Sequence, residues 1–213
     1  MQEELTIRIA GAAGQGMQTL GRIISLVCKR AGFSIFAHQD YMSRVRGGNN
    51  FYQLRVGSRD FKAPRDTVNL LVALNMESVD IHRSSLDANG IVLFDGENSS
   101  EIKNTFRRIQ VPFKEIAEER GGSDTYANSV AAGCLTECVG IQSKLYLGEV
   151  MKVIFGSKGD KAVDNNIKAA EAGYEYASDI RSDSGEETGY VTVSHNNRTG
   201  PLVMNGNEAI ALG

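Results

Sequence analysis

A glycine-rich turn between a strand pattern and a helix pattern constrains the fold of this sequence more than any other feature. Residues 5–10 alternate apolar and polar side chains, as a half-buried strand does, and three glycines follow within residues 11–16. Residues 17–31 then place apolar side chains at helical spacing, and residues 33–37 give a second strand pattern. Strand, glycine turn, helix and strand in this order predict the start of an α/β domain.

The rest of the chain continues this alternation of strand and helix patterns. We expect further strands at residues 53–56, 68–74, 91–94 and 109–113, and helices at residues 76–88, from Asn128, at 149–155 and at 161–177. Residues 68–74 are almost continuously apolar, which is typical of a strand covered on both faces. The strand at residues 53–56 is short, and we place it at an edge of the sheet. Pro112 cannot donate a backbone hydrogen bond to a neighbouring strand, so we place this proline at an edge or at a strand end. The predicted fold class is α/β, Rossmann-like, with a mostly parallel sheet and helices on both faces.

The composition changes near residue 180 and divides the chain into three parts. Residues 1–180 are predicted to form the domain, residues 181–200 a polar, glycine-containing linker, and residues 201–213 the ordered start of a further region. Residues 205–208 are suited to cap a helix, and the sequence ends about one turn into that helix. We therefore expect the further region to continue beyond Gly213.

Composition and charge argue against several functional classes. The 213 residues carry a formal net charge of −3, which argues against general nucleic-acid binding, and no stretch approaches the roughly 20 apolar residues of a membrane span. The acidic first residues lack the basic flank and apolar core of a secretory signal. Cys28, Cys134 and Cys138 give no disulfide framework, so we expect a cytoplasmic protein with reduced thiols buried in the core. We predict no catalytic residue and no metal ligand in this chain.

The glycine turn has the properties of an anion site. Glycine permits positive φ and lets a ligand approach the backbone, and a helix N-terminus offers unpaired N–H groups with partial positive charge. The carboxyl end of the first strand is also where open α/β sheets bind ligands. Gly11, Gly14 and Gly16 have the spacing G-x-x-G-x-G, which is neither the dinucleotide fingerprint nor a Walker P-loop. The alternative is that the glycines only permit a tight turn and close packing of the helix on the sheet.

A second candidate site follows the second strand, in a segment too rich in glycine and asparagine for regular structure. This segment runs over residues 41–50 and contains Arg44, Arg46, Gly47 and Gly48. Residues 41–66 include six basic residues and only two acidic ones, which gives a local charge of +4. Arginine in a glycine loop suits bidentate contact with phosphate or carboxylate, on the same edge of the sheet as the glycine turn. The alternatives are a solvated charged loop and a surface that forms salt bridges with a partner subunit.

These motifs together resemble the γ domain of the 2-oxoacid:ferredoxin oxidoreductases. Residues 9–16 are similar to the glycine- and glutamine-containing turn that opens this domain, with Ala13 where a glycine is often found. Residues 43–50 and the strand after them resemble the family's arginine-glycine-glycine segment, and Asn128 at the start of a helix matches a weaker family feature. Residues 205–213 resemble the start of the family's α region, and the order γ then α is similar to the fused form of the enzyme.

The resemblance implies oxidative decarboxylation of a 2-oxoacid, such as pyruvate or 2-oxoglutarate, to an acyl-CoA, with electrons passed to ferredoxin. It implies thiamine diphosphate and iron–sulfur clusters on other domains or subunits, and coenzyme A binding and assembly for this domain. The partners would be the α-type region and the β subunit, within an oligomer. The cofactor-binding candidates are then Gly11, Gly14, Gln15, Gly16, Ser43, Arg44, Arg46, Gly47, Gly48 and Asn128. Three scattered cysteines cannot supply a four-cysteine cluster, so we expect this chain alone to be inactive.

Two other functions remain open on the sequence. The domain could serve assembly alone and bind no ligand, in which case a partner chain would cover the predicted edge. It could also be a free-standing nucleotide-dependent oxidoreductase, with Asp40 near the position of a ribose-binding acid. The glycine spacing and the adjacent arginines count against this last alternative.

Overall fold

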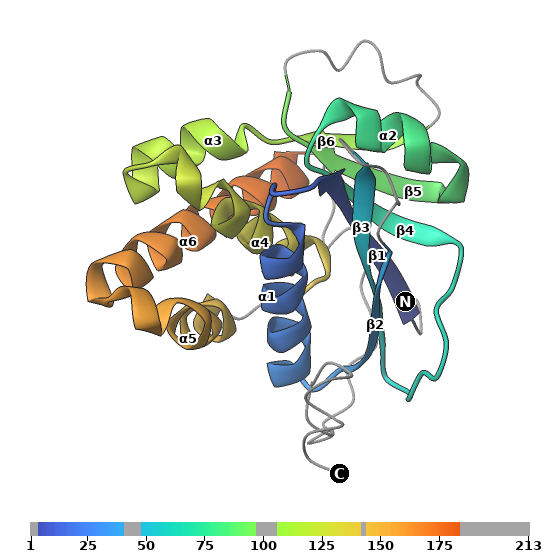
Figure 1. Ribbon diagram of the computed structural model, residues 1–213, viewed down its shortest axis with the longest axis horizontal. Coiled ribbons are helices and arrows are strands. Elements are labelled where there is room, and N and C mark those ends of the chain that lie inside the picture. The colour runs from blue at the N-terminus through green and yellow to red at the C-terminus, as the bar shows by residue number, and fades with distance from the viewer. Residues whose placement is uncertain (1–3, 41–47, 97–105, 142–143, 184–213) are drawn as a thin grey trace.

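A single six-stranded sheet with strand order β2-β3-β1-β4-β5-β6 forms the centre of the protein (Figure 1). The computed structural model describes residues 4–40, 48–96, 106–141 and 144–183. The strands are β1 (Glu4–Ala12), β2 (Ser34–Asp40), β3 (Asn49–Gly57), β4 (Val68–Ala73), β5 (Leu86–Phe94) and β6 (Arg107–Gln110). The α-helices are α1 (Met17–Arg30), α2 (Met76–His82), α3 (Phe113–Ile116), α4 (Ala127–Cys138), α5 (Lys144–Phe155) and α6 (Asp160–Asp183). Shorter helical turns lie at Arg83–Ser85, Ala117–Gly121, Asp124–Tyr126 and Gly156–Lys158.

The sheet is mostly parallel, as predicted. β1 pairs parallel with β4, β4 with β5, and β5 with β6. β3 pairs antiparallel with both β1 and β2, so β2 has the same direction as β1 but is separated from it by one strand. Five of the six strands therefore share one direction, and their carboxyl ends meet at one edge of the sheet. This edge carries the glycine turn between β1 and α1.

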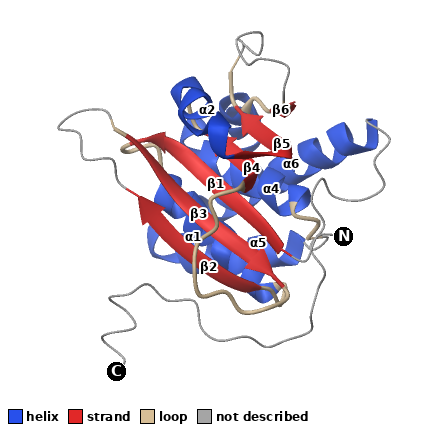
Figure 2. Ribbon diagram, turned by 90° about the vertical axis from the view of Figure 1, so that its right-hand side faces the viewer, coloured by secondary structure: helices blue, strands red, loops and turns tan. Residues whose placement is uncertain are grey.

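Helices cover the two faces of the sheet unequally. The alternating residues Leu5, Ile7 and Ile9 of β1 pack with α1, α3, α4, α5 and α6 in the larger core, whereas Ala10 of the same strand belongs to a smaller core under α2. The prediction of helices on both faces is thus confirmed. On the α2 side, α2 contacts β1, β4 and β5, and the connection between β3 and β4 crosses the sheet over β3 (Figure 2).

The strand predicted at residues 53–56 is confirmed as part of β3, but its short length and its place at an edge of the sheet are wrong. β3 has nine residues and lies between β2 and β1, with seven residues paired to β2 and nine to β1. The strand was underestimated because one of its faces carries Asn49, Gln53 and Arg55, which are polar. Polar partners on β1, on α2 and in the connection after β3 satisfy these side chains, and such partners cannot be read from neighbouring residues.

The predicted helix at residues 76–88 is too long. α2 ends at His82, one 3₁₀ turn follows, and β5 begins at Leu86 opposite Val68 of β4. The register between β4 and β5 shifts after this pair, and Gly90 lies in the irregular stretch. A Cβ at Gly90 would lie 2.9 Å from the carbonyl oxygen of Asp87, so this glycine permits a bulge rather than ending a helix.

The other predicted elements agree with the structure within a few residues. The strand around residue 109 is the edge strand β6, and Pro112 lies just beyond its end. α6 runs to Asp183, three residues past the predicted end of the domain at residue 180. The remainder of the predicted linker and residues 201–213 lie outside the described residues, so those boundaries stay predictions. Among the helices that the structure describes, none combines the length and apolar character needed to cross a membrane.

Helices α4 and α6 cross with their backbones in direct contact. Gly133 of α4 and Gly173 of α6 lie at this crossing. A Cβ at Gly133 would lie 2.7 Å from the amide nitrogen of Tyr174 and closer still to the carbonyl oxygen of Ala170. A Cβ at Gly173 would overlap the carbonyl group of Val130 in the same way. The two glycines therefore set the distance between these helices, which carry much of the larger core.

Candidate functional site

The glycine turn joins β1 to α1 with two residues in the left-handed region. Gly14 has φ 90° and Gly16 has φ 78°, so both positions favour glycine. Gly16 is the N-cap of α1, no side chain caps the helix, and its first turn contains no acidic residue. Gly14 is exposed, and a Cβ built on it would meet no atom of the described residues within 4 Å. The exposed backbone of the glycine turn thus lies in front of the N-terminus of α1, and this arrangement of backbone N–H groups binds anions.

Gln15 braces this turn against the end of β4. Its Oε1 accepts a hydrogen bond from the backbone N–H of Ala12 at 2.6 Å, and its Nε2 donates to the carbonyl oxygen of Leu74 at 3.1 Å. Gly11 is buried beside it, where a Cβ would lie 3.1 Å from the Cβ of Leu74. Gly11 therefore permits close packing, and the Gln15 side chain holds the turn.

Asn128 comes from far along the chain to contact the same turn. It lies in the first turn of α4, and its Nδ2 donates to the carbonyl oxygen of Gln15 at 3.0 Å. A Cβ at Gly16 would overlap this amide group, so only glycine leaves room for Asn128 there. The structure thus brings five of the predicted site residues together, namely Gly11, Gly14, Gln15, Gly16 and Asn128.

The remaining predicted site residues lie in or beside the segment between β2 and β3. Gly48 is described and buried, and it directly precedes β3. Ser43, Arg44, Arg46 and Gly47 lie outside the described residues. The flanks of the segment are nevertheless fixed, because Asn49 pairs with Ala12 and Asn50 pairs with Gly11 in the register of β3 and β1. The segment therefore leaves and rejoins the sheet at the edge that carries the glycine turn.

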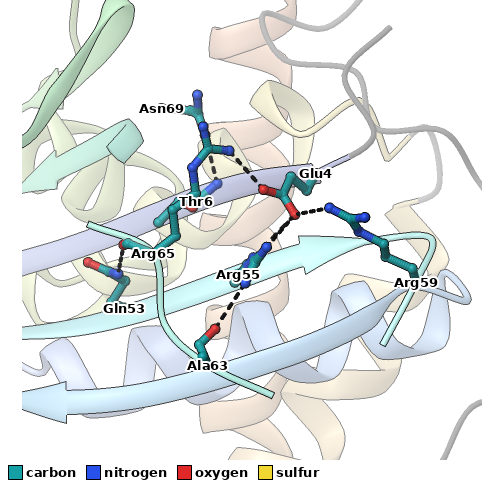
Figure 3. A network of polar contacts seen from close by, with 8 residues as sticks. All are labelled: Glu4, Thr6, Gln53, Arg55, Arg59, Ala63, Arg65 and Asn69. Atoms are coloured by element: carbon teal, nitrogen blue, oxygen red, sulfur yellow. Dashed lines mark hydrogen bonds and ion pairs between the residues drawn. The ribbon is translucent and has the colours of Figure 1, made fainter. Parts of the chain in front are cut away.

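The basic residues of the 41–66 region do not all gather at this edge. Arg55, Arg59 and Arg65 converge instead on Glu4, at the opposite end of β1 (Figure 3). Oε2 of Glu4 accepts from Nη2 of Arg55 at 2.7 Å and Oε1 accepts from Nη1 of Arg65 at 2.8 Å. Arg55 also donates to the carbonyl oxygen of Ala63 at 3.1 Å, so the cluster fastens the connection between β3 and β4 over the face of the sheet that carries α2.

This cluster predicts an acid-sensitive contribution to stability. Burial raises the pKa of the Glu4 carboxyl, but hydrogen bonds from Arg55 and Arg59 and the charges of Arg55 and Arg65 outweigh it, so the pKa lies below its ordinary value. The stabilisation is therefore complete above the unfolded value of about 4.3 and is lost as the pH falls through the lower folded pKa. Glu4→Gln should lower the free energy of unfolding by roughly 2 kcal/mol at neutral pH and flatten its decline in acid.

Urea unfolding of both proteins at a series of pH values measures this effect. Glu149→Gln is the matched control, because Glu149 pairs with Arg30 at an exposed site, where an ion pair contributes little. An unchanged acid dependence in Glu4→Gln would contradict the assignment.

Sequence reasoning missed Arg8, which is buried on the face of the sheet that carries α2. Its side chain lies 4.5 Å above the ring of Phe51 and contacts His82 of α2. Burial, followed by the charge of Arg8, lowers the pKa of His82 to about 4, so this histidine is neutral at physiological pH. In the sequence, Arg8 stands among the polar positions of an alternating strand, a pattern that is also typical of a solvated face.

The cysteines are core residues, as predicted. Cys28, Cys134 and Cys138 are free and buried, and burial raises the pKa of the Cys28 thiol to about 12. Cys134 donates to the carbonyl oxygen of Gly173 inside the α4–α6 contact. Across the described ranges, no group of three or more histidine, cysteine or acidic residues is arranged to hold a metal ion.

Asp40 does not take the position of a ribose-binding acid beside β1. It ends the edge strand β2, and β3 separates it from β1, which places it about two strand spacings, or roughly 10 Å, away. In the dinucleotide-binding arrangement the acid follows the strand next to β1. The insertion of an antiparallel strand therefore counts against the nucleotide-dependent alternative.

Fold and site together define an α/β domain with a glycine turn and an uncapped helix N-terminus at the carboxyl edge of a mostly parallel sheet. The chain belongs to the pyruvate ferredoxin/flavodoxin oxidoreductase family, whose sequence profile matches residues 6–176. The family resemblance seen in the sequence is confirmed.

Curated relatives differ in how much of their length this chain spans. The ketoisovalerate oxidoreductase subunit VorA of Methanothermobacter thermautotrophicus is 29% identical over 177 residues, which cover 82% of this chain and 36% of VorA. The 2-oxoglutarate synthase subunit KorC of Archaeoglobus fulgidus is 28% identical over 176 residues, which cover 82% of this chain and 89% of KorC. The chain thus spans little more than a third of VorA but nearly all of KorC.

Solved structures show the same fold. The 2-oxoglutarate:ferredoxin oxidoreductase from Magnetococcus marinus, with 2-oxoglutarate, coenzyme A and succinyl-CoA bound, aligns with a TM-score of 0.83 and 25% identity over 100% of this chain and 37% of that chain. The keto/oxoacid ferredoxin oxidoreductase gamma subunit from Geobacter sulfurreducens PCA aligns with a TM-score of 0.70 and 23% identity over 84% of this chain and 98% of that chain. The match to the whole gamma subunit supports the fold alone at this identity.

Proposed function

We propose that this chain is the γ-type part of a 2-oxoacid:ferredoxin oxidoreductase and that its glycine-turn edge binds the phosphate groups of coenzyme A. The complete enzyme would convert a 2-oxoacid and coenzyme A to an acyl-CoA and carbon dioxide and pass the electrons to ferredoxin. Family membership, the KorC relative and the coenzyme A in the Magnetococcus marinus structure support this proposal. The α-type region and the β subunit would be the partners in an oligomer.

The first turn of α1 is the observation that carries the ligand assignment. It has no side-chain cap and no acidic residue, and among the described residues nothing would contact a Cβ at Gly14, whose backbone is exposed in front of it. Phosphate oxygens accept hydrogen bonds from such N–H groups and are attracted by the helix dipole. The Gln15 side chain is occupied with the protein, so the turn would contact the ligand through backbone groups. The segment between β2 and β3 would add side-chain and backbone contacts, from Ser43, Arg44, Arg46, Gly47 and Gly48.

Thiamine diphosphate and iron–sulfur clusters would lie on other parts of the enzyme. They supply decarboxylation and electron transfer when bound. The described part of this chain does not fit an iron–sulfur cluster, because its three cysteines are buried separately in the packing of α1 and α4. The free thiols also fit a reducing compartment, and we place the protein in the cytoplasm.

Calorimetric titration of the assembled enzyme with coenzyme A tests the site. Replacing Arg46 with alanine should weaken binding roughly 10-fold or more, because a hydrogen bond between charged groups contributes about 1.5–3 kcal/mol. Arg59→Ala is the matched control, since Arg59 belongs to the same basic region but pairs with Glu4 at the far end of the sheet. Equal affinity in the wild type and Arg46→Ala would remove Arg46 from the site. Failure of the wild-type enzyme to bind coenzyme A here would favour the assembly role.

A further inference from the structure

A chain of side-chain hydrogen bonds begins at Arg8, buried in the middle of β1, and reaches the surface at the glycine turn. The Arg8 side chain is only 7% exposed, and within the described residues it forms no ion pair. Its Nε donates to Oε1 of Gln53 at 2.7 Å, and its Nη1 lies 3.2 Å from Nδ1 of His82. A buried guanidinium needs acceptors for its N–H groups, and here neutral side chains provide them.

The chemistry of the donors fixes the direction of the next bonds. A guanidinium can only donate, so Nδ1 of His82 accepts from Arg8 and the proton of the neutral ring is on Nε2. Nε2 therefore donates to Oδ1 of Asn49, at 3.2 Å. Asn49 is the first residue of β3, so this bond ties α2 to the start of that strand.

The same reasoning extends the chain to the glycine turn. Nδ2 of Asn49 donates to Oγ of Ser78 at 2.7 Å, and the Ser78 hydroxyl donates to Oδ1 of Asn75 at 2.8 Å. Nδ2 of Asn75 donates to Oε1 of Gln15 at 2.8 Å. Every link from Arg8 to Gln15 therefore points one way, and bonds aligned in this manner strengthen one another. We call the six residues Arg8, His82, Asn49, Ser78, Asn75 and Gln15 the Arg8 chain.

The Arg8 chain ends on the structures that border the proposed site. Gln15 holds the glycine turn through the backbone N–H of Ala12. Ala12 is paired across the sheet with Asn49, which is itself a member of the chain. The turn before α1 and the start of β3 are thus connected twice, once through the backbone ladder and once through the side chains of Ser78, Asn75 and Gln15.

We propose that the Arg8 chain positions the glycine turn and the start of β3 as one unit, and that Ser78 and Asn49 are positioning residues for the anionic ligand of this edge. This inference rests on the proposed function, in which the ligand is coenzyme A. Neither residue needs to touch the ligand. Ser78 is fully buried, and its hydroxyl is the link between the two asparagines.

Steady-state kinetics of the assembled enzyme tests the proposal. Ser78→Ala removes the central link and should raise the KM for coenzyme A about fivefold, which corresponds to one typical hydrogen bond. The KM for the 2-oxoacid should not change. Ser78→Thr keeps the hydroxyl and should restore much of the coenzyme A affinity. Ser25→Ala is the matched control, because Ser25 is 1% exposed and its hydroxyl donates within α1 to the carbonyl oxygen of Gly21.

The outcomes separate this inference from the proposed function. If the Ser78→Ala enzyme has the same KM for coenzyme A as the wild type, the positioning role is overturned, while the proposed coenzyme A site stands. Equal effects of Ser78→Ala and Ser25→Ala on the KM for coenzyme A would also overturn it. So would a Ser78→Ala enzyme that loses only kcat, in proportion to the fraction of unfolded protein. An Arg46→Ala enzyme with unchanged affinity for coenzyme A would count instead against the proposed ligand contacts.

Discussion

Replacing Gly133 with alanine is expected to destabilise the folded chain by about 3 kcal/mol. The new methyl group would meet the carbonyl oxygen of Ala170 and the amide nitrogen of Tyr174, which belong to the backbone of α6 and cannot rotate away. Relief requires α4 and α6 to separate, and this would open the larger core that both helices help to form. The loss should exceed the gain of up to about 1 kcal/mol that alanine brings to a helix interior. Urea unfolding followed by circular dichroism measures the difference.

Gly148→Ala is the matched control for this prediction. Gly148 also lies inside a helix, α5, but a Cβ at this position would meet no atom within 4 Å. The substitution should therefore leave the stability unchanged or raise it by up to about 1 kcal/mol. Equal unfolding midpoints for Gly133→Ala and the wild type would contradict the close crossing of α4 and α6.

Replacing Arg181 with methionine is expected to destabilise the chain by about 3–5 kcal/mol. Nε of Arg181 donates to Oε1 of Glu137, whose side chain is only 4% exposed. The substitution would leave the Glu137 carboxylate buried without this cation, and the cost of a buried uncompensated charge is large. The pair also joins the end of α6 to α4, so the last turn of α6 should fray.

A double-mutant cycle separates the ion pair from its surroundings. Glu137→Met combined with Arg181→Met removes both charges and should recover most of the stability that Arg181→Met alone loses. Thermal or urea unfolding of the four proteins gives the coupling between the two positions. Additive effects of the two substitutions would show that the pair does not act as a unit.

The glycine turn was predictable because its requirements are local. The alternation in β1, the spacing of Gly14 and Gly16 and the apolar stripe of α1 each depend on residues close in sequence. The same holds for β4, whose continuous apolar run required cover on both faces. The order of these elements was enough to predict a mostly parallel α/β sheet with an anion-type turn at one edge.

The contacts around that turn were not predictable in the same way. The full length and the central position of β3 were not predicted, because the partners of its polar face, Arg8, Ser78 and Arg65, come from other elements. The basic residues between 41 and 66 were predicted to share one edge of the sheet. β3 separates them, because it runs antiparallel to β1 and places Arg55 toward the opposite end of the sheet from Asn49. Neither the antiparallel insertion of β3 nor the meeting of Asn128 with the turn follows from a pattern in neighbouring residues.

By itself the sequence determined the class of fold, the glycine turn and the family resemblance, because periodicity and backbone conformation are set by neighbouring residues. Only the tertiary structure decided that β3 lies between β2 and β1, that three arginines serve Glu4, and that Arg8 is connected to Gln15 through α2. The physical reason is that burial and hydrogen-bond partners depend on which distant segments meet. A polar side chain in the sequence looks the same whether water or another buried side chain satisfies it.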